Sequence, residues 1–200
     1  INAGSGKDQH PTQALLDIYT LKRSFKNRGG IDNKQIAFVG DLLRGRTIRS
    51  LSCLLTKYRE VKQYFVAPAG FQISDDLRSY LDESGVCYEI TEDFESIIPL
   101  VDAIYMTRLQ DEWDEVDGTT QKLDLDHYSI TDKQLPLLKP DAIIMHPLPR
   151  RQEISREVDA DPRATYWKQV RNGMWIRAAL IAMIFNRDRN IFEYYLNHNL

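Results

Sequence analysis

Two arginines in this 200-residue sequence follow short apolar runs, where a strand would give way to a loop. Arg46 opens a segment expected to be helical, and Arg49 adds a positive charge one turn later. A cation at a helix N-terminus is disfavoured by about 0.3–1 kcal/mol. An anion bound between Arg46 and the free N–H groups of the helix would explain why an arginine stands there. Arg108 follows another apolar run, and a guanidinium grips a carboxylate through two parallel hydrogen bonds. Together the arginines indicate a ligand with two carboxylates, or with a phosphate and a carboxylate.

A stiff loop is expected at "HPLPR", where Pro147 and Pro149 flank Leu148 directly after an apolar run. Proline fixes φ and lacks an N–H donor, so the carbonyl groups of this loop should point in set directions. Such carbonyls suit an amide –NH₂ group. A plain proline turn is the alternative.

The stretch "HPTQALLD" is expected to begin a helix with Pro11 in its first turn. His10 and Gln13 share one face of that helix, and Asp17 continues the polar stripe. The apolar stripe runs through Ala14, Ile18, Leu21 and Phe25. Taken alone, this stretch favours a solvated surface helix.

The elements that must position these residues alternate between short apolar runs and amphipathic segments. Strands are expected at 35–40, 61–66, 86–90, 101–106 and 141–145. Helices are expected from 11 up to the glycine pair at 29–30, and at 46–58, 75–83, 94–98 and 171–195. This order predicts an α/β fold, a three-layer Rossmann-like parallel sheet with helices on both faces. Ligands of such sheets bind beyond the carboxyl ends of the strands, where the arginines and the proline loop would lie.

Composition excludes several classes of protein. The chain is 42% hydrophobic and 28% charged, with a net charge of −3 and interspersed signs, which argues against a nucleic-acid partner. The longest nearly apolar run, Met174–Phe185, contains Arg177 and is too short to span a membrane. Cys53 and Cys87 fit reduced thiols, so we expect a cytoplasmic protein.

No cofactor or metal motif is recognisable. "GSGK" at Gly4–Lys7 lacks the spacing of a phosphate-binding P-loop, and Gly40 and Gly45 form no dinucleotide fingerprint. His127 and His198 have no partner at metal-ligand spacing. We therefore expect neither a cofactor nor a metal.

Four stretches together resemble the aspartate carbamoyltransferase family: "HPTQALLD", "GDLLRGRTIRSL", "TRLQ" and "MHPLPR". They occur in that family's order and approximate spacing, and "DADPRATYWKQVRNGMWIRAALI" resembles its C-terminal segment. The sister ornithine enzymes carry cysteines where this sequence has Thr12 and Pro147. The resemblance implies transfer of the carbamoyl group of carbamoyl phosphate to the α-amine of L-aspartate, giving N-carbamoyl-L-aspartate and phosphate in pyrimidine biosynthesis.

By position in these motifs, the resemblance implies contacts at the carbamoyl end of the site. His10 would donate a hydrogen bond to the carbamoyl oxygen, where negative charge grows in the transition state. Gln13 and the carbonyls of Pro147 and Leu148 would hold the carbamoyl –NH₂ group.

The resemblance also implies contacts at the aspartate end. Arg46, Arg108 and Gln110 would bind the two carboxylates of aspartate. Glu112 would orient Arg108. The long acidic segment 111–130 is expected to be a mobile functional element or a disordered one.

The family further implies a homotrimer with shared active sites, and regulatory chains as further partners. We expect residues 1–30 to be an interdomain helix from a carbamoyl phosphate domain, 31–170 an aspartate-binding α/β domain, and 171–200 a C-terminal bridging helix. The family's Ser-Thr-Arg-Thr phosphate loop is not in this sequence. Because the sequence starts at Ile1 without a leading element, we expect it to be a piece of a longer chain.

Two other functions stay open on the sequence. One is a non-catalytic binding or assembly module, favoured by the missing phosphate loop. The other is a carbamoyltransferase for another amino acid, because Asp111 and Trp113 stand where the family has a basic residue and an arginine.

Overall fold

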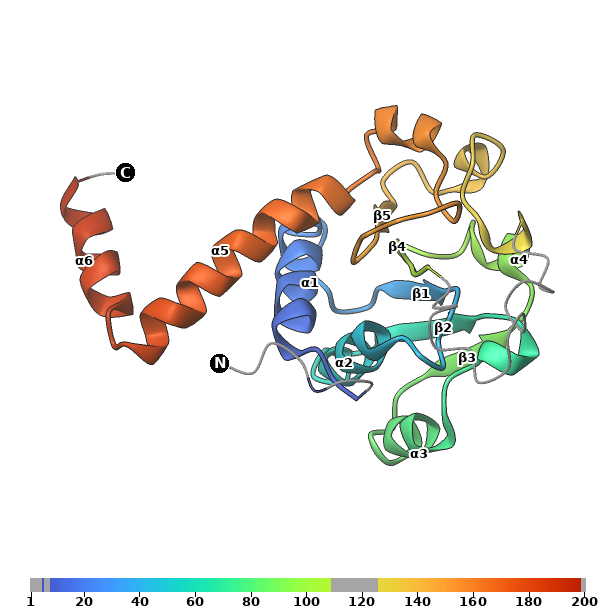
Figure 1. Cartoon of the computed structure of the whole chain (residues 1–200), viewed down its shortest axis with the longest axis horizontal. Helices are drawn as coiled ribbons and strands as arrows, with labels where there is room; N and C mark the ends of the chain where they lie inside the picture. Colours follow the sequence, from blue (N-terminus) through green and yellow to red (C-terminus); the bar gives the residue numbers. More distant parts are fainter. Residues whose placement is uncertain (1–4, 6–7, 109–125, 199–200) are drawn as a thin grey trace.

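The computed structural model describes residue 5, residues 8–108 and residues 126–198, and its centre is a parallel five-stranded sheet (Figure 1). The strands are β1 (Gln35–Val39), β2 (Lys62–Val66), β3 (Tyr88–Thr91), β4 (Ala103–Met106) and β5 (Ile143–Met145). Their order in the sheet is β3-β2-β1-β4-β5, and every pairing is parallel. All five predicted strands are therefore present, with ends shifted by one or two residues.

Six α-helices accompany the sheet in the described part of the chain. They are α1 (Pro11–Ser24), α2 (Arg46–Leu55), α3 (Asp75–Glu83), α4 (Phe94–Ile97), α5 (Tyr166–Ile184) and α6 (Asp188–His198). Short 3-10 turns lie at Ala69–Phe71, Asp126–Tyr128, Leu135–Leu137 and Arg156–Ala160. None of the described helices has the length and apolar character that crossing a lipid bilayer needs.

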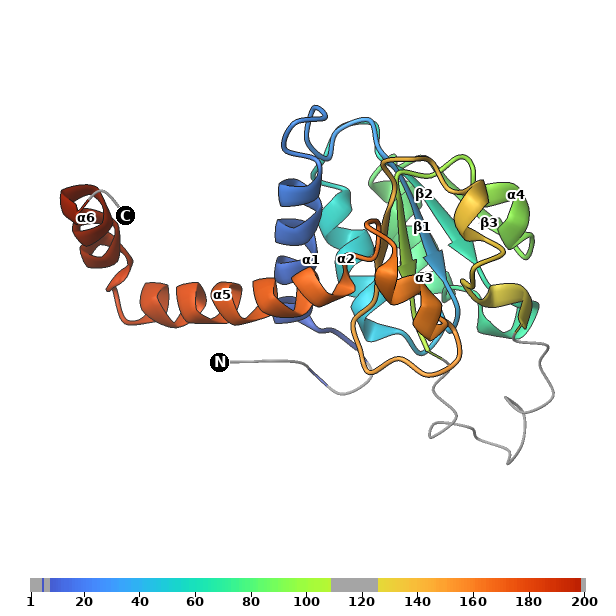
Figure 2. The same cartoon turned by 90° about the horizontal axis from the view of Figure 1, so that it is seen from above.

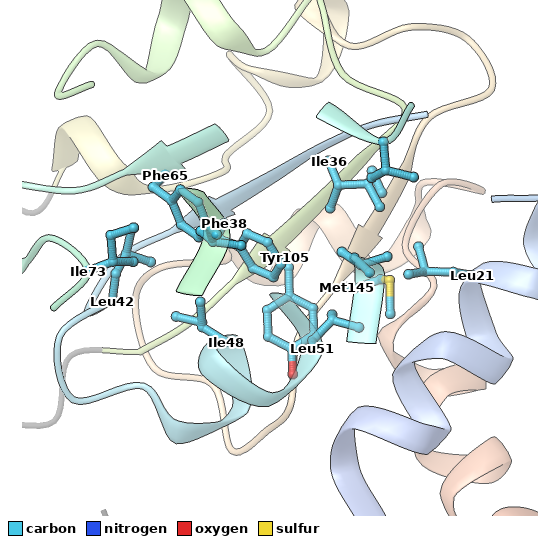
Figure 3. Packing of buried hydrophobic residues seen from close by; sticks show 14 of the residues in the cluster. Leu21, Ile36, Phe38, Leu42, Ile48, Leu51, Phe65, Ile73, Tyr105 and Met145 are labelled. Carbon is cyan, nitrogen blue, oxygen red and sulfur yellow. The ribbon is translucent and has the colours of Figure 1, made fainter. Parts of the chain in front are cut away.

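One face of the sheet packs against α1, α2 and α3. Phe38, Phe65 and Tyr105 project from neighbouring strands on this face, and Phe38 lies 5.4 Å from Phe65 and 5.8 Å from Tyr105 between ring centres (Figure 3). Leu21 of α1 and Leu51 of α2 belong to the same cluster and are fully buried. The alternation of strand residues thus builds this half of the core.

The opposite face packs against α4, the 3-10 turns after residue 126 and the start of α5. Val39, Val66 and Met106 point to this side, and Phe94 of α4 and Val158 cover them. Both faces of β1, β2, β4 and β5 are largely buried, as parallel sheets require, whereas the edge strand β3 is partly exposed. The predicted three-layer α/β class is confirmed.

The strand order reverses between β1 and β4, because the chain runs outward from β1 through β2 and β3 and then returns to the other side of β1. Val39 pairs with Met106 at the carboxyl end of this pair. The next residue, Gly40, has φ of 115°, and a Cβ there would lie 2.3 Å from the carbonyl oxygen of Thr107. Only glycine fits this approach. The reversal marks the crevice where doubly wound sheets bind ligands.

The last helix differs from its prediction. The predicted helix 171–195 is two helices, because α5 begins at Tyr166 and ends at Ile184. Asn186 adopts a left-handed φ of 52°, and the Arg187 N–H donates to the Ala182 carbonyl at 2.8 Å. These contacts are a Schellman cap, which asparagine can form without glycine. The second half of α5 and all of α6 extend away from the sheet (Figures 1 and 2).

The first helix also ends earlier than predicted. α1 stops at Ser24, where the Phe25 N–H still reaches the Leu21 carbonyl, and a stretch of turns follows at residues 25–29. Gly29 and Gly30 lie at the end of these turns with φ of 80° and 78°, and the Gly30 N–H donates to the Phe25 carbonyl at 3.0 Å. They shape the connection to β1 rather than the helix end. The division of the chain at residues 30 and 170 stays a prediction.

Candidate active site

One cavity of about 250 Å³ lies at the carboxyl ends of β1, β4 and β5. Its lining includes six predicted site residues: His10, Gln13, Arg46, Arg108, Pro147 and Leu148. Thr47, Thr107, His146 and Pro149 complete the lining. Gln110, Glu112, Asp111 and Trp113 lie outside the described residues, as does most of the acidic segment 111–130. The structure thus gathers into one space every predicted site residue that it describes.

Two helix N-termini open into this cavity. His10 is the N-cap residue of α1, and Gln13 is the third residue of that helix. Arg46 and Thr47 are the first two residues of α2. Free N–H groups and the helix dipoles favour negative charge at such ends. With Arg108 at the end of β4, the cavity is built for an anionic ligand.

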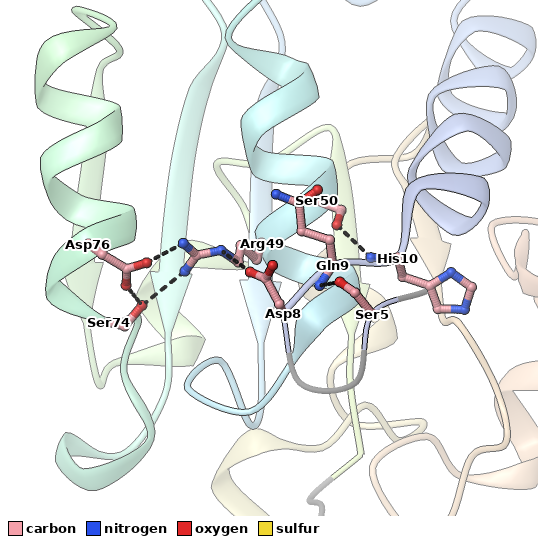
Figure 4. A network of polar contacts seen from close by, with 8 residues as sticks. All are labelled: Ser5, Asp8, Gln9, His10, Arg49, Ser50, Ser74 and Asp76. Atoms are coloured by element: carbon pink, nitrogen blue, oxygen red, sulfur yellow. Dashed lines mark hydrogen bonds and ion pairs between the residues drawn. The ribbon is translucent and has the colours of Figure 1, made fainter. Parts of the chain in front are cut away.

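The backbone of His10 is anchored by a hydrogen bond, and its side chain lines the cavity. Its N–H donates to the Ser50 hydroxyl at 2.9 Å, which ties the start of α1 to α2 (Figure 4). Burial lowers the pKa of His10, and the charges of Arg46 and Arg177 lower it further. The imidazole is therefore mainly neutral at neutral pH and keeps one N–H donor. Within the described residues its Nδ1 atom has no hydrogen-bond partner.

Beneath the cavity, Asp17 is fully buried on α1 and collects three hydrogen bonds. The Gln13 and Gln169 side chains donate through Nε2 to Oδ1 at 2.9 and 2.7 Å, and the Tyr105 hydroxyl donates to Oδ2 at 2.8 Å. Burial raises the pKa of Asp17 to about 7, although these donors oppose the rise. The network joins α1, β4 and α5 directly under Gln13.

The same network reaches the proline loop. The Gln169 side-chain oxygen accepts the His146 backbone N–H at 2.9 Å, and His146 Nδ1 accepts the Leu148 N–H at 2.8 Å. The imidazole therefore carries its proton on Nε2, which lies 2.7 Å from a Glu153 oxygen. Leu148 has a left-handed φ of 56°. These contacts tie the loop to α5 and to Glu153. The set directions expected for the Pro147 and Leu148 carbonyls stay a prediction.

Arg150 clamps the far end of the proline loop. Its guanidinium donates two hydrogen bonds of 2.6 Å to the Asp159 carboxylate. The guanidinium carbon Cζ lies 5.5 Å from the centre of the Tyr166 ring. The guanidinium lowers the pKa of Asp159. This bidentate pair cannot be reproduced by lysine.

Arg49 does not line this cavity, contrary to the expectation that its charge adds to the anion site. It pairs with Asp76 on α3 and lies 3.6 Å from an Asp8 oxygen (Figure 4). The bond to Asp76 holds the pKa of that carboxyl well below its usual range. Arg49 therefore lines a neighbouring cavity of about 190 Å³ with its charge balanced.

Sequence reasoning missed the supporting residues Gln169 and His146 and the buried hydrogen-bond network around Asp17. Asp17 had a local signal, since it stands four residues after Gln13 on one helix face. Gln169 had no local signal, because 152 positions separate it from Asp17.

In the described part of the chain, no cluster of three His, Cys, Asp or Glu side chains could hold a metal ion.

The family model for the aspartate/ornithine carbamoyltransferase Asp/Orn binding domain matches residues 32–184. The chain belongs to this carbamoyltransferase family. It is 44% identical to the chloroplastic aspartate carbamoyltransferase of Arabidopsis thaliana over 92% of this chain and 46% of that protein. It is 43% identical to the aspartate carbamoyltransferase catalytic subunit of Vibrio cholerae over 94% of this chain and 59% of that subunit. The chain thus spans about half the length of these curated relatives.

Solved structures of aspartate transcarbamoylases share the fold of this family member. The catalytic subunit from M. jannaschii superposes with a TM-score of 0.82 at 36% identity, over 94% of this chain and 60% of that one. The Trypanosoma cruzi enzyme in complex with N-(phosphonacetyl)-L-aspartic acid gives a TM-score of 0.80 at 37% identity, over 90% and 57%. The T. cruzi enzyme has also been solved with carbamoyl phosphate and aspartate bound.

Proposed function

We propose that this chain forms the aspartate-binding part of an aspartate carbamoyltransferase. The reaction would transfer the carbamoyl group of carbamoyl phosphate to the α-amine of L-aspartate, giving N-carbamoyl-L-aspartate and phosphate. One observation carries the proposal: two arginines, a histidine and groups that accept amide N–H bonds line one cavity at the strand-order reversal.

At the aspartate end, Arg46 and Arg108 bind the two carboxylates of the substrate. Each guanidinium can offer two parallel N–H donors to one carboxylate, and both side chains line the cavity. Gln110 would add a further contact and Glu112 would orient Arg108, as the family resemblance implies. Binding both carboxylates orients the α-amine toward the carbamoyl carbon.

At the carbamoyl end, the neutral His10 ring donates its N–H to the carbamoyl oxygen. The amine nitrogen attacks the carbonyl carbon and that oxygen gains negative charge. The C–O bond to phosphate then breaks, and the amine proton passes to an oxygen of the departing phosphate. A donor aimed at the growing charge lowers the barrier by a few kcal/mol, about 3. Gln13, Pro147 and Leu148 hold the –NH₂ group, so positioning supplies much of the remaining rate.

Partners and location follow from the same proposal. Phosphate contacts would come from a further domain and from a neighbouring subunit of a homotrimer with shared active sites, and regulatory chains would be further partners. The predicted cytoplasmic location stays a prediction, and the names of several relatives place those proteins in chloroplasts.

The test is a transfer assay on the natural protein with carbamoyl phosphate and a series of acceptors. Aspartate should be the preferred acceptor, and Arg46→Ala should raise the KM for aspartate by about 100-fold or more, since a charge-assisted bidentate contact is lost. A preference for ornithine or another amine would favour a different carbamoyltransferase. Tight aspartate binding with no turnover would favour a non-catalytic module.

A further inference from the structure

Asp17 is a buried carboxylate that no part of the proposed reaction uses. It is fully buried and does not line the cavity, yet Gln13, Tyr105 and Gln169 all donate to it. Burying a carboxyl group is costly even when it is well paired. A buried carboxylate at position 17 therefore needs a compensating role.

The hydrogen bonds of Gln169 fix which atom of Asp17 accepts. The side-chain oxygen of Gln169 is occupied by the His146 N–H at 2.9 Å, so its Nε2 must be the atom that faces Asp17 Oδ1 at 2.7 Å. Oδ1 is therefore an acceptor. This holds for the neutral carboxyl too, because its proton can sit on Oδ2 beside the Tyr105 hydroxyl.

The direction of the Gln13 amide follows. Since Oδ1 of Asp17 accepts, Gln13 must present its Nε2 to that atom, at 2.9 Å. The other amide atom, Oε1, is then the one left for a ligand in the cavity that Gln13 lines. Reversing the amide would set its oxygen against the oxygen of Asp17.

We propose that Asp17 is a positioning residue that turns the Gln13 amide oxygen toward the bound acyl group, and so gives the site its preference for an acyl phosphate ending in –NH₂ over one ending in –CH₃. The inference rests on the proposed function and adds the residue that sets the selectivity for the acyl phosphate substrate. Gln169 extends this control to the proline loop through His146.

The selectivity has a simple chemical basis. A carbamoyl –NH₂ group has two N–H donors, and it would meet three acceptors: Gln13 Oε1 and the carbonyls of Pro147 and Leu148. A methyl group leaves these acceptors unpaired, which sites built for hydrogen bonds reject strongly. A reversed Gln13 amide would set donor against donor and remove the preference.

Two variants of Asp17 and one control separate this role from a structural one. Asp17→Leu removes the acceptor, whereas in Asp17→Asn Oδ1 still accepts from both glutamines and Nδ2 faces the Tyr105 oxygen. The control is Thr20→Val on the same pair of helices, where Asn172 donates to the Thr20 hydroxyl at 2.9 Å in a buried contact. Neither Thr20 nor Asn172 lines the cavity.

The experiment measures kcat/KM for carbamoyl phosphate at saturating aspartate and the inhibition constant of acetyl phosphate in the natural protein. Asp17→Leu should lower kcat/KM by about 10- to 100-fold and change the acetyl phosphate constant by less than about threefold. Asp17→Asn and Thr20→Val should keep the wild-type selectivity, which is kcat/KM for carbamoyl phosphate compared with the affinity for acetyl phosphate. In a Gln13→Met background, Asp17→Leu should cause no further loss of selectivity, because Asp17 acts through Gln13.

Each contrary result has a distinct meaning. Equal losses with both acyl phosphates, or an additional loss in the Gln13→Met background, would overturn the positioning role while leaving the proposed function standing. Absence of carbamoyl transfer in the wild type would overturn both. If the leucine variant does not fold, Asp17→Ser replaces it, because serine keeps a hydroxyl group in the same space. This variant should lose selectivity in the same direction by a smaller factor, and an unchanged selectivity would again overturn the inference.

Discussion

Replacing Asp17 by asparagine should make the stability of the protein less dependent on pH. Asp17 is fully buried, and burial raises the pKa of its carboxyl from 3.8 to about 7 in the folded protein. The folded state therefore holds a proton that the unfolded state releases near pH 4. Asparagine resembles the protonated carboxyl in shape and hydrogen bonding, and it does not titrate.

The magnitude follows from the shift in pKa. The contribution of Asp17 is fully present below pH 3.8 and is lost as the pH rises through about 7. A shift of about three units corresponds to a total loss of ~4 kcal/mol. Roughly 2–3 kcal/mol of this loss falls between pH 5 and pH 8, because the unfolded chain is already ionised at pH 5.

Urea unfolding of wild type and Asp17→Asn at pH 5 and pH 8 measures this directly. The free energy of unfolding of the variant relative to the wild type should rise by roughly 2–3 kcal/mol between the two pH values. Other titrating groups cancel in that difference, and Thr20→Val serves as a control whose difference from wild type should not change with pH. A pH-independent difference for Asp17→Asn would refute the buried, raised-pKa carboxyl.

Three further substitutions test the elements that hold the site. Gly40→Ala should lower the free energy of unfolding by at least about 3 kcal/mol, because its Cβ would lie 2.3 Å from the Thr107 oxygen at a φ of 115°; a smaller loss in urea unfolding would contradict that contact. Asn186→Ala should cost about 1 kcal/mol while Asn186→Gly costs nothing, because the cap needs a left-handed residue; equal melting temperatures for the two would count against the cap. Arg150→Lys should cost about 1–3 kcal/mol through the lost bidentate bond to Asp159, and Asp159→Asn alone should cost a similar amount, with the double variant losing less than the sum.

Much of the fold could be read from the sequence because it depends on local patterns. Apolar runs bounded by glycine and proline gave all five strands, and their alternation with helices required parallel pairing. Arg46, Arg108 and the proline loop could be assigned to strand ends for the same reason. Boundaries were less certain, and the break at Asn186 was missed because asparagine is only one of several residues that can end a helix.

The sequence by itself determined which chemical groups follow which strand, since that is a property of neighbours along the chain. Only the tertiary structure decided that β4 lies beside β1, which brings Arg108 to Arg46 and His10 in one cavity. Packing of α5 on α1 likewise set Gln169 against Asp17 across 152 positions. Strand order and helix packing are chosen by the shared burial of many side chains, and no local pattern carries that information.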